Sequence, residues 1–249
     1  MLLVESAGVQ LDRDTTTPTP GWLLDERARA GRENLDTAHV ARYDAKEDAG
    51  AQQEVALLRE LGLGADSLVL DFGAGTEQFS LAVAPFCERV IAIDVSEPML
   101  ARLQAKLARL RLENVELARG GLLSYEHALR PADFIYSRLA LHHLPDFWKA
   151  LALSRLRAML SAAGLLRLCD VVYDFDPDAA PERIEAWCAT GGESSEADWS
   201  RAELEEHVRD EHSTFSWLLE PMMQRSGFHV RQAEYSQDGI FAKYLLAPA

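Results

Sequence analysis

The chain has 249 residues, 48% of them hydrophobic, which is enough to bury one large domain or a core with a modest cap. Its 25 Lys and Arg against 40 Asp and Glu give a formal net charge of −15, which disfavours a nucleic-acid partner because phosphate binding depends on basic side chains. The three cysteines, Cys87, Cys169 and Cys188, show neither paired metal-ligand spacing nor an even disulfide framework. We find no basic, apolar leader and no run of ~20 apolar residues, and therefore expect a cytoplasmic protein without a membrane partner.

Residues 1–63 are expected to form an N-terminal arm and helices. Residues 15–20 contain only Thr and Pro, a polar stretch that can bury little surface. The charged segment that follows has few apolar side chains, Trp22 among them, to anchor it. Residues 51–61 carry apolar side chains at helical spacing and are followed by a glycine, so we predict a helix there.

Residues 64–175 alternate the patterns of buried strands and amphipathic helices. We predict strands near 68–72, 89–94, 115–119, 133–137 and 165–172, and helices near 76–86, 97–111 and 146–160. Strands that alternate with helices favour a parallel sheet with helices on both faces. The predicted fold class is therefore α/β, with a Rossmann-like, doubly wound and mostly parallel sheet.

A glycine-rich turn lies between the first two predicted strands. It reads Asp71-Phe72-Gly73-Ala74-Gly75-Thr76-Glu77, and Asp94 ends the next strand 19 positions after Gly75. At about this spacing a nucleotide-binding unit places an acid on a ribose. A helix N-terminus normally attracts phosphate, but Glu77 in its first turn would repel it. The turn therefore suits a nucleoside ligand with positive charge and no phosphate, such as S-adenosylmethionine.

These residues and two later segments, in the same order, resemble the class I S-adenosylmethionine-dependent methyltransferases of small molecules. In that family the turn reads acid-x-Gly-x-Gly-x-Gly, and Asp71, Gly73 and Gly75 match its first three places. Residues 133–146, Asp-Phe-Ile-Tyr-Ser-Arg-Leu-Ala-Leu-His-His-Leu-Pro-Asp, resemble the fourth strand and the segment after it. Residues 160–166, Leu-Ser-Ala-Ala-Gly-Leu-Leu, resemble the turn before the fifth strand.

The resemblance implies which residues hold the cofactor. Asp94 would hydrogen-bond the ribose hydroxyls, the Gly73–Gly75 turn would let the backbone approach the methionine end, and Asp71 would hold that turn and the amino group. Tyr43 either lies over the methionine end, where its ring would face the sulfonium, or packs in the core. The full set of expected cofactor contacts is Tyr43, Asp71, Gly73, Ala74, Gly75, Asp94, Val95, Met99, Gly121, Leu122, Ser137 and Leu139.

Two positions depart from the family pattern. Glu77 stands where a third loop glycine is usual, and it either stabilises the helix dipole, contacts the cationic end of the cofactor or weakens the site. Gly121 stands where many relatives have an acid that accepts a hydrogen bond from the adenine amino group. Backbone groups near Leu122, helped by Ser124, are then expected to read adenine.

The segment after the fourth strand is expected to face the substrate. His142 and His143 are the candidate catalytic residues, because an imidazole with a pKa near 6.5 suits a general base. Alternatively one histidine packs against the loop, and methyl transfer driven by proximity and orientation needs no base. The expected substrate contacts are Arg138, His143 and Trp217, although Arg138 could pair with one of the surplus carboxylates instead.

Residues 176–226 are predicted to form a helical cap inserted before the last strands. Ser200 and Glu203 match a capping box, so a helix should begin at Arg201, and a further helix is expected over 214–225. His207 and Glu211 are four residues apart, a spacing that can hold a metal ion. A solvated acidic helix explains the same residues, and we predict no metal site.

Residues 227–249 are predicted to form a hairpin that completes the sheet. Gln237-Asp238-Gly239 separates the strand patterns 228–235 and 240–246, which is a strong hairpin signal. A hairpin ending matches the antiparallel last strand of the family, and it brings the sheet to seven strands.

The expected function is transfer of a methyl group from S-adenosylmethionine to an oxygen, nitrogen or carbon atom of a small molecule, by a monomer or homodimer. The alternatives are a cyclase or isomerase that uses the same cofactor, a tRNA-modifying enzyme of this fold, and a non-catalytic binding protein. The net charge of −15 speaks against tRNA. Gln78 stands where a nicotinamide dehydrogenase would have its third glycine, which speaks against that class.

Overall fold

The computed structural model describes residues 20–31, 50–76, 78–192 and 199–249. Its elements, with η for 3₁₀ helices, are η1 Arg27–Arg29, α3 Ala51–Glu60, β1 Leu68–Phe72, α4 Gln78–Val83, η2 Ala84–Phe86, β2 Arg89–Asp94, α5 Glu97–Leu110, β3 Val115–Arg119, β4 Ala132–Arg138, η3 Leu141–His143, α6 Asp146–Met159, β5 Leu160–Tyr173, η4 Pro177–Ala179, α7 Ala180–Cys188, α8 Arg201–Asp210, β6 Thr214–Phe215, α9 Ser216–Arg225, β7 Phe228–Tyr235 and β8 Phe241–Pro248. The expectations for Tyr43 and Glu77 lie outside the described residues. Among the described helices, none has the length and apolar character needed to cross a membrane.

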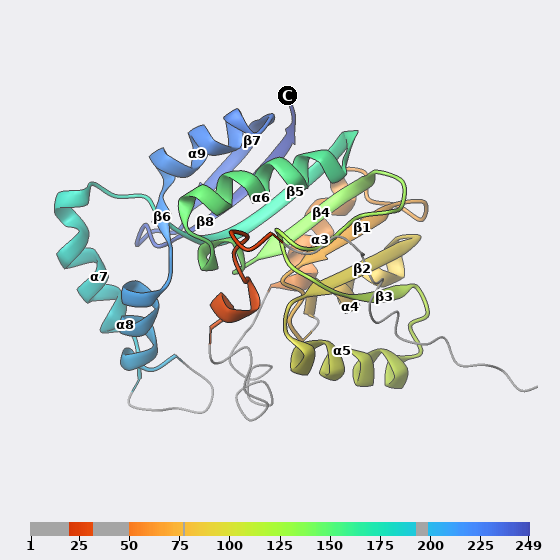
Figure 1. Ribbon diagram of the computed structural model, residues 1–249, viewed down its shortest axis with the longest axis horizontal. Helices are drawn as coiled ribbons and strands as arrows, with labels where there is room; N and C mark the ends of the chain where they lie inside the picture. Colours follow the sequence, from red (N-terminus) through yellow and green to blue (C-terminus); the bar gives the residue numbers. More distant parts are fainter. Residues whose placement is uncertain (1–19, 32–49, 77, 193–198) are drawn as a thin grey trace, which may run out of the picture.

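The strands form one sheet in the order β3-β2-β1-β4-β5-β8-β7 (Figure 1). The first five of these strands pair in parallel, and β8 runs antiparallel to both β5 and β7. The predicted mostly parallel sheet with an antiparallel last strand is thereby confirmed. The short β6 pairs in parallel with the end of β5 and brings the total to eight strands.

Two of the boundaries that differ from the sequence prediction have a cause in strand pairing. The backbone of Thr214 and Phe215 pairs with β5, so the helix expected from residue 214 begins at Ser216. The turn expected over 160–166 belongs to β5, which starts at Leu160. The pairing of β5 with β4 contains a register shift in this region, and the shift accommodates the additional residues of β5.

Alternate residues of the central strands contribute side chains to two hydrophobic cores, one on each face of the sheet. Leu70 and Phe72 of β1 pack with Leu153 of α6 in the core that α9 also covers. Val69, between them in sequence, packs with Leu103 of α5 in the core that α3 and α4 also cover. Side chains of a strand alternate between its two faces, so the near-continuous apolar pattern of β1 requires both helical layers.

The helices α7 and α8 stand apart from the two layers that cover the sheet (Figure 1). Trp187 of α7 and Leu204 of α8 pack against Val171 and Tyr173 at the end of β5. The predicted capping box is present, since the Ser200 Oγ accepts from the Glu203 N–H while the Glu203 carboxylate accepts from the Ser200 N–H. This box fixes the start of α8, and therefore the direction in which its later residues reach the sheet.

A buried ion pair joins α3 to β5. The Arg167 guanidinium, 2% exposed, donates to both Glu54 oxygens at 2.7 and 3.3 Å, and Lys243 of β8 donates to the same carboxylate at 2.7 Å. Burial alone raises the pKa of Glu54, but the hydrogen bonds from Arg167 and Lys243 outweigh burial and hold this pKa below its usual value. The pair therefore ties the N-terminal helix to the centre of the sheet.

Candidate functional site

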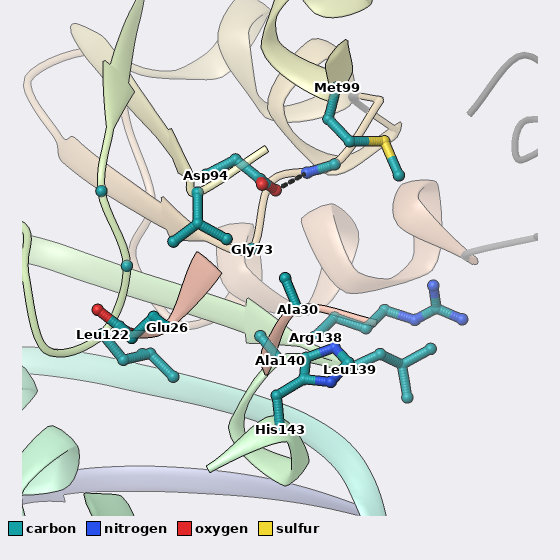
Figure 2. A pocket seen from close by; sticks show the side chains of 14 residues that line it. Glu26, Ala30, Gly73, Asp94, Met99, Leu122, Arg138, Leu139, Ala140 and His143 are labelled. Atoms are coloured by element: carbon teal, nitrogen blue, oxygen red, sulfur yellow. Dashed lines mark hydrogen bonds between the residues drawn. The ribbon is translucent and has the colours of Figure 1, made fainter. Parts of the chain in front are cut away.

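A cavity lies beyond the carboxyl ends of the parallel strands, next to the loops that follow the paired strands β1 and β4 (Figure 2). It is lined by Glu26, Ala30, Gly73, Gly75, Asp94, Val95, Met99, Gly120, Gly121, Leu122, Arg138, Leu139, Ala140 and His143. It leaves about 640 Å³ free of protein atoms, part of which is open to solvent. Open α/β sheets bind their ligands at this switch point.

The glycine turn brings the loops after β1 and β4 into close contact. Gly73 has a φ of +72°, and the N–H groups of Gly73 and Ala74 donate to the Ile93 carbonyl of β2 at 3.0 and 3.1 Å. A Cβ at Gly73 would lie 2.7 Å from the Ala140 Cβ. Only glycine meets both the backbone conformation and this approach, so the turn leaves bare backbone facing the cavity.

Asp94 connects the turn to α5. Its Oδ2 accepts from the Gly75 N–H at 2.8 Å, the bond drawn in Figure 2, and its Oδ1 accepts from the Ser96 N–H at 2.7 Å. Burial raises the pKa of Asp94, although the bonds from Ser96 and Gly75 oppose that shift. Each carboxylate oxygen has a second lone pair, so Asp94 can also accept from hydroxyl groups of a ligand.

The lining fits S-adenosylmethionine. Bare backbone at Gly73 would let the methionine end approach, the Asp94 oxygens suit the two ribose hydroxyls, and the apolar side chains of Met99 and Leu122 suit a flat adenine. Figure 2 shows Glu26 and Leu122 together on one side of the cavity, with Arg138 and His143 on another.

The structure brings most of the expected residues to this cavity, but not all of them. Gly73, Gly75, Asp94, Val95, Met99, Gly121, Leu122, Arg138, Leu139 and His143 line it, whereas Asp71, Ala74, Ser137, His142 and Trp217 are not in the lining. Asp71 lies buried beneath the turn, where the Ser80 hydroxyl donates to it at 2.6 Å, and burial raises its pKa to about 7. Trp217 is 55% exposed and stacks on Phe215.

Glu26 is the main cavity residue that sequence reasoning missed. Its carboxylate accepts from the Ser124 hydroxyl at 2.8 Å. A Cβ on Gly121 would overlap this carboxylate, so Glu26 occupies the space that a side chain at position 121 would take. Burial raises the pKa of Glu26. The one signal for this contact was Trp22, which stacks on Trp148 and anchors the segment.

His142 is buried beside the cavity and is held by Asp170 of β5. The His142 Nδ1 lies 2.5 Å from the Asp170 Oδ1, and the Asp170 Oδ2 accepts from the backbone N–H groups of Leu141 and His142. Burial disfavours the charged imidazole, yet the adjacent Asp170 raises the pKa of His142 above its usual value. The same contact lowers the pKa of Asp170 despite its burial.

His143 lines the cavity and is held by Glu211, which follows α8. The His143 Nδ1 lies 2.6 Å from the Glu211 Oε2, and the His142 Nε2 lies 3.8 Å from the same oxygen. Both histidines contribute to lowering the pKa of Glu211 against the effect of burial. His207 packs edge-on against His142, and burial lowers its pKa to about 4. The predicted cap thus brings two of its ligand-type residues to the loop after β4.

Comparison with known proteins identifies the same region. A family model described as a methyltransferase domain matches residues 69–164. An uncharacterized methyltransferase of Anoxybacillus flavithermus is 28% identical over 164 residues, 66% of this chain and 70% of that protein. A SAM-dependent methyltransferase structure from Aquifex aeolicus superposes with a TM-score of 0.59 at 17% identity, covering 85% of this chain and 98% of that one. The magnesium protoporphyrin IX methyltransferase of Synechocystis PCC 6803, solved with bound SAM, gives 0.61 at 14% identity, covering 92% and 99%.

Proposed function

We propose that the chain is a class I S-adenosylmethionine-dependent methyltransferase, and that it methylates an oxygen, nitrogen or carbon atom of a small molecule, as a monomer or homodimer. The observation that carries this proposal is that Asp94 and His143 line one cavity, so a carboxylate suited to a ribose and an imidazole suited to an acceptor face the same space. The net charge of −15 favours a small acceptor over a nucleic acid.

The chain contributes mainly by positioning. S-adenosylmethionine supplies a methyl group activated by an adjacent sulfonium. We propose that Asp94 holds its ribose, the Gly73–Gly75 backbone its methionine end, and Met99 with Leu122 its adenine. Methyl transfer is an in-line displacement, and most of its acceleration comes from holding the two reactants in line and excluding water.

His143 is proposed to meet the acceptor, and His142 to support it. Glu211 fixes the ring of His143 through Nδ1, whereas Asp170 and burial keep His142 out of the cavity lining. Arg138, on the same side of the cavity, is proposed to contact an acidic part of the acceptor (Figure 2). Residues 176–226 would then act as a cap that closes the acceptor side.

Glu26 is proposed to replace the acid that Gly121 lacks and to accept a hydrogen bond from the adenine amino group. Replacing Glu26 with alanine should weaken binding of S-adenosylhomocysteine about 10- to 100-fold, since a hydrogen bond to a charged group contributes about 1.5–3 kcal/mol. Calorimetric titration with S-adenosylhomocysteine and with its inosine analogue, which lacks the amino group, measures this directly.

The unmodified protein should prefer the adenine ligand, and the Glu26→Ala variant should lose that preference. Glu182→Gln, an exposed acid on α7, is the matched control and should bind both ligands like the unmodified protein. If Glu26→Ala binds S-adenosylhomocysteine more tightly than the unmodified protein does, Glu26 blocks the adenine position instead of recognising it.

The proposed function is tested with methyl-labelled S-adenosylmethionine. We would offer the protein phenols, aliphatic amines and carboxylic acids, with total tRNA and a mixture of proteins alongside, and follow both label transfer and S-adenosylhomocysteine. Label in a small acceptor with an equal amount of S-adenosylhomocysteine is the expected result. Label in tRNA would identify an RNA-modifying enzyme, product without S-adenosylhomocysteine a cyclase or isomerase, and binding without turnover a non-catalytic protein.

A further inference from the structure

We propose that His142, His143 and Glu211 form a binding site for a divalent transition-metal ion, with zinc as the best match. Each of these residues offers one ligand atom, and the three atoms lie within 4.8 Å of one another. The Glu211 Oε2 lies 2.6 Å from the His143 Nδ1 and 3.8 Å from the His142 Nε2. The three residues come from two parts of the chain, since the histidines form η3 after β4 and Glu211 follows α8.

The donor set selects the class of ion. Two imidazoles and one carboxylate are the three protein ligands of many catalytic zinc sites, whereas magnesium and calcium prefer oxygen donors alone. Ligands about 2.0–2.1 Å from a tetrahedral zinc stand about 3.3 Å apart. The two distances to the Glu211 Oε2, 2.6 and 3.8 Å, fall on either side of that spacing. Small side-chain movements would therefore bring both histidine nitrogens to the spacing that a shared ion requires.

Asp170 prepares His142 to act as a ligand. Its Oδ1 accepts from the His142 Nδ1, which fixes the proton on that nitrogen and leaves the Nε2 lone pair directed toward Glu211. Three backbone N–H groups, those of Leu141, His142 and Val171, hold the carboxylate in place. Metal-binding histidines usually donate their second nitrogen to such a carboxylate.

The charges of the cluster also suit a dication. The buried Asp170 and the half-buried Glu211 bring two negative charges to the cluster, and Lys149, on the neighbouring α6, donates instead to Asp146 and to the His212 carbonyl. An ion of charge +2 with neutral histidines balances both carboxylates. Two protonated histidines would balance them as well, so metal binding has to be measured.

An ion at this place would serve the proposed function, on which this consequence depends. Three protein ligands leave a fourth position open, and His143 lines the cavity in which the acceptor is proposed to bind. A bound zinc lowers the pKa of an oxygen that coordinates it, so it would hold an acceptor hydroxyl or carboxyl in its deprotonated form. The imidazole of His143 would then orient the ion instead of taking the proton itself.

The test measures the ion alone, with no S-adenosylmethionine present, so a failed methyltransferase assay does not affect it. Protein stripped with a chelator is titrated with Zn²⁺ by calorimetry, and Co²⁺ is added separately to record visible absorption. We expect one ion per chain, and the intense visible bands of Co²⁺ with four or five ligands. Glu211→Gln and His142→Asn should each weaken Zn²⁺ binding at least about 100-fold, and Asp170→Asn about 10- to 100-fold.

Glu206→Gln on α8 and His229→Ala on β7, both exposed, are matched controls and should bind Zn²⁺ like the unmodified protein. Zn²⁺ binding that survives both Glu211→Gln and His142→Asn would overturn the proposal, and so would the absence of stoichiometric binding to the unmodified protein. If a variant fails to fold, the Co²⁺ spectrum of the unmodified protein decides, because weak octahedral bands would exclude the proposed site.

Discussion

Replacing Asp94 with alanine is expected to weaken binding of S-adenosylmethionine and S-adenosylhomocysteine by about 100-fold to 10,000-fold. The carboxylate is proposed to accept from two ribose hydroxyls, and each hydrogen bond to a charged group contributes about 1.5–3 kcal/mol. The same substitution removes the acceptor of the Gly75 and Ser96 N–H groups, so the glycine turn also loses its anchor. Calorimetric titration with both ligands measures the loss.

Asp178→Asn, which alters an exposed acid on η4, is the matched control for Asp94→Ala and should bind both ligands normally. Thermal unfolding without ligand separates a lost contact from a lost fold, because Asp94→Ala should still unfold cooperatively. A variant that folds and binds within about threefold of the unmodified protein would contradict the assignment of Asp94 to the ribose, since threefold is only about 0.7 kcal/mol.

Replacing Glu54 with glutamine is expected to lower the free energy of unfolding by about 3–5 kcal/mol, because it leaves the Arg167 guanidinium without its buried charge partner. The effect should depend on pH. The pKa of Glu54 is lower in the folded chain than its usual value of about 4.3, so its contribution is present above that pH and is lost as the pH falls through the folded pKa.

Urea unfolding at pH 7 and at steps down to about pH 3 measures this change, with the difference between unmodified protein and Glu54→Gln shrinking toward the acid end. Glu234→Gln is the matched control, because Glu234 contacts the same guanidinium at 3.5 Å but is 49% exposed and should contribute at most about 1 kcal/mol. Equal losses for the two variants, or a difference that does not change with pH, would contradict the buried-pair argument.

The parts of the site that the sequence predicted are those that depend on short-range geometry. Gly73, Gly75 and Asp94 are placed by one strand-turn-helix unit and the strand that follows it, so their spacing alone indicates a nucleoside site. The order of strands and helices between residues 64 and 175 was predictable for the same reason. Element boundaries were less certain where tertiary pairing decides them, as at the two residues of β6.

The parts that the sequence did not predict depend on contacts between distant segments. Glu26 reaches Gly121 from a segment with no regular apolar pattern, and tertiary contacts such as Leu24 against the core and Trp22 on Trp148 hold that segment in place. Asp170 has no distinguishing sequence signal within its predicted strand, and its bond to His142 follows from the pairing of β4 with β5. The spacing of His207 and Glu211 suggested two ligands on one helix, whereas the structure directs Glu211 to His142 and His143.

The contact of Glu26 with Gly121 has a consequence for how such chains diversify. Glu26 precedes the matched methyltransferase domain, residues 69–164, and Asp170 and Glu211 follow it. The shared domain carries Asp94 and the glycine turn, which are proposed to place the methyl donor. Selectivity at the adenine end and at the acceptor end would then depend partly on flanking sequence, so chains with nearly identical central domains can evolve different substrates without altering the donor site.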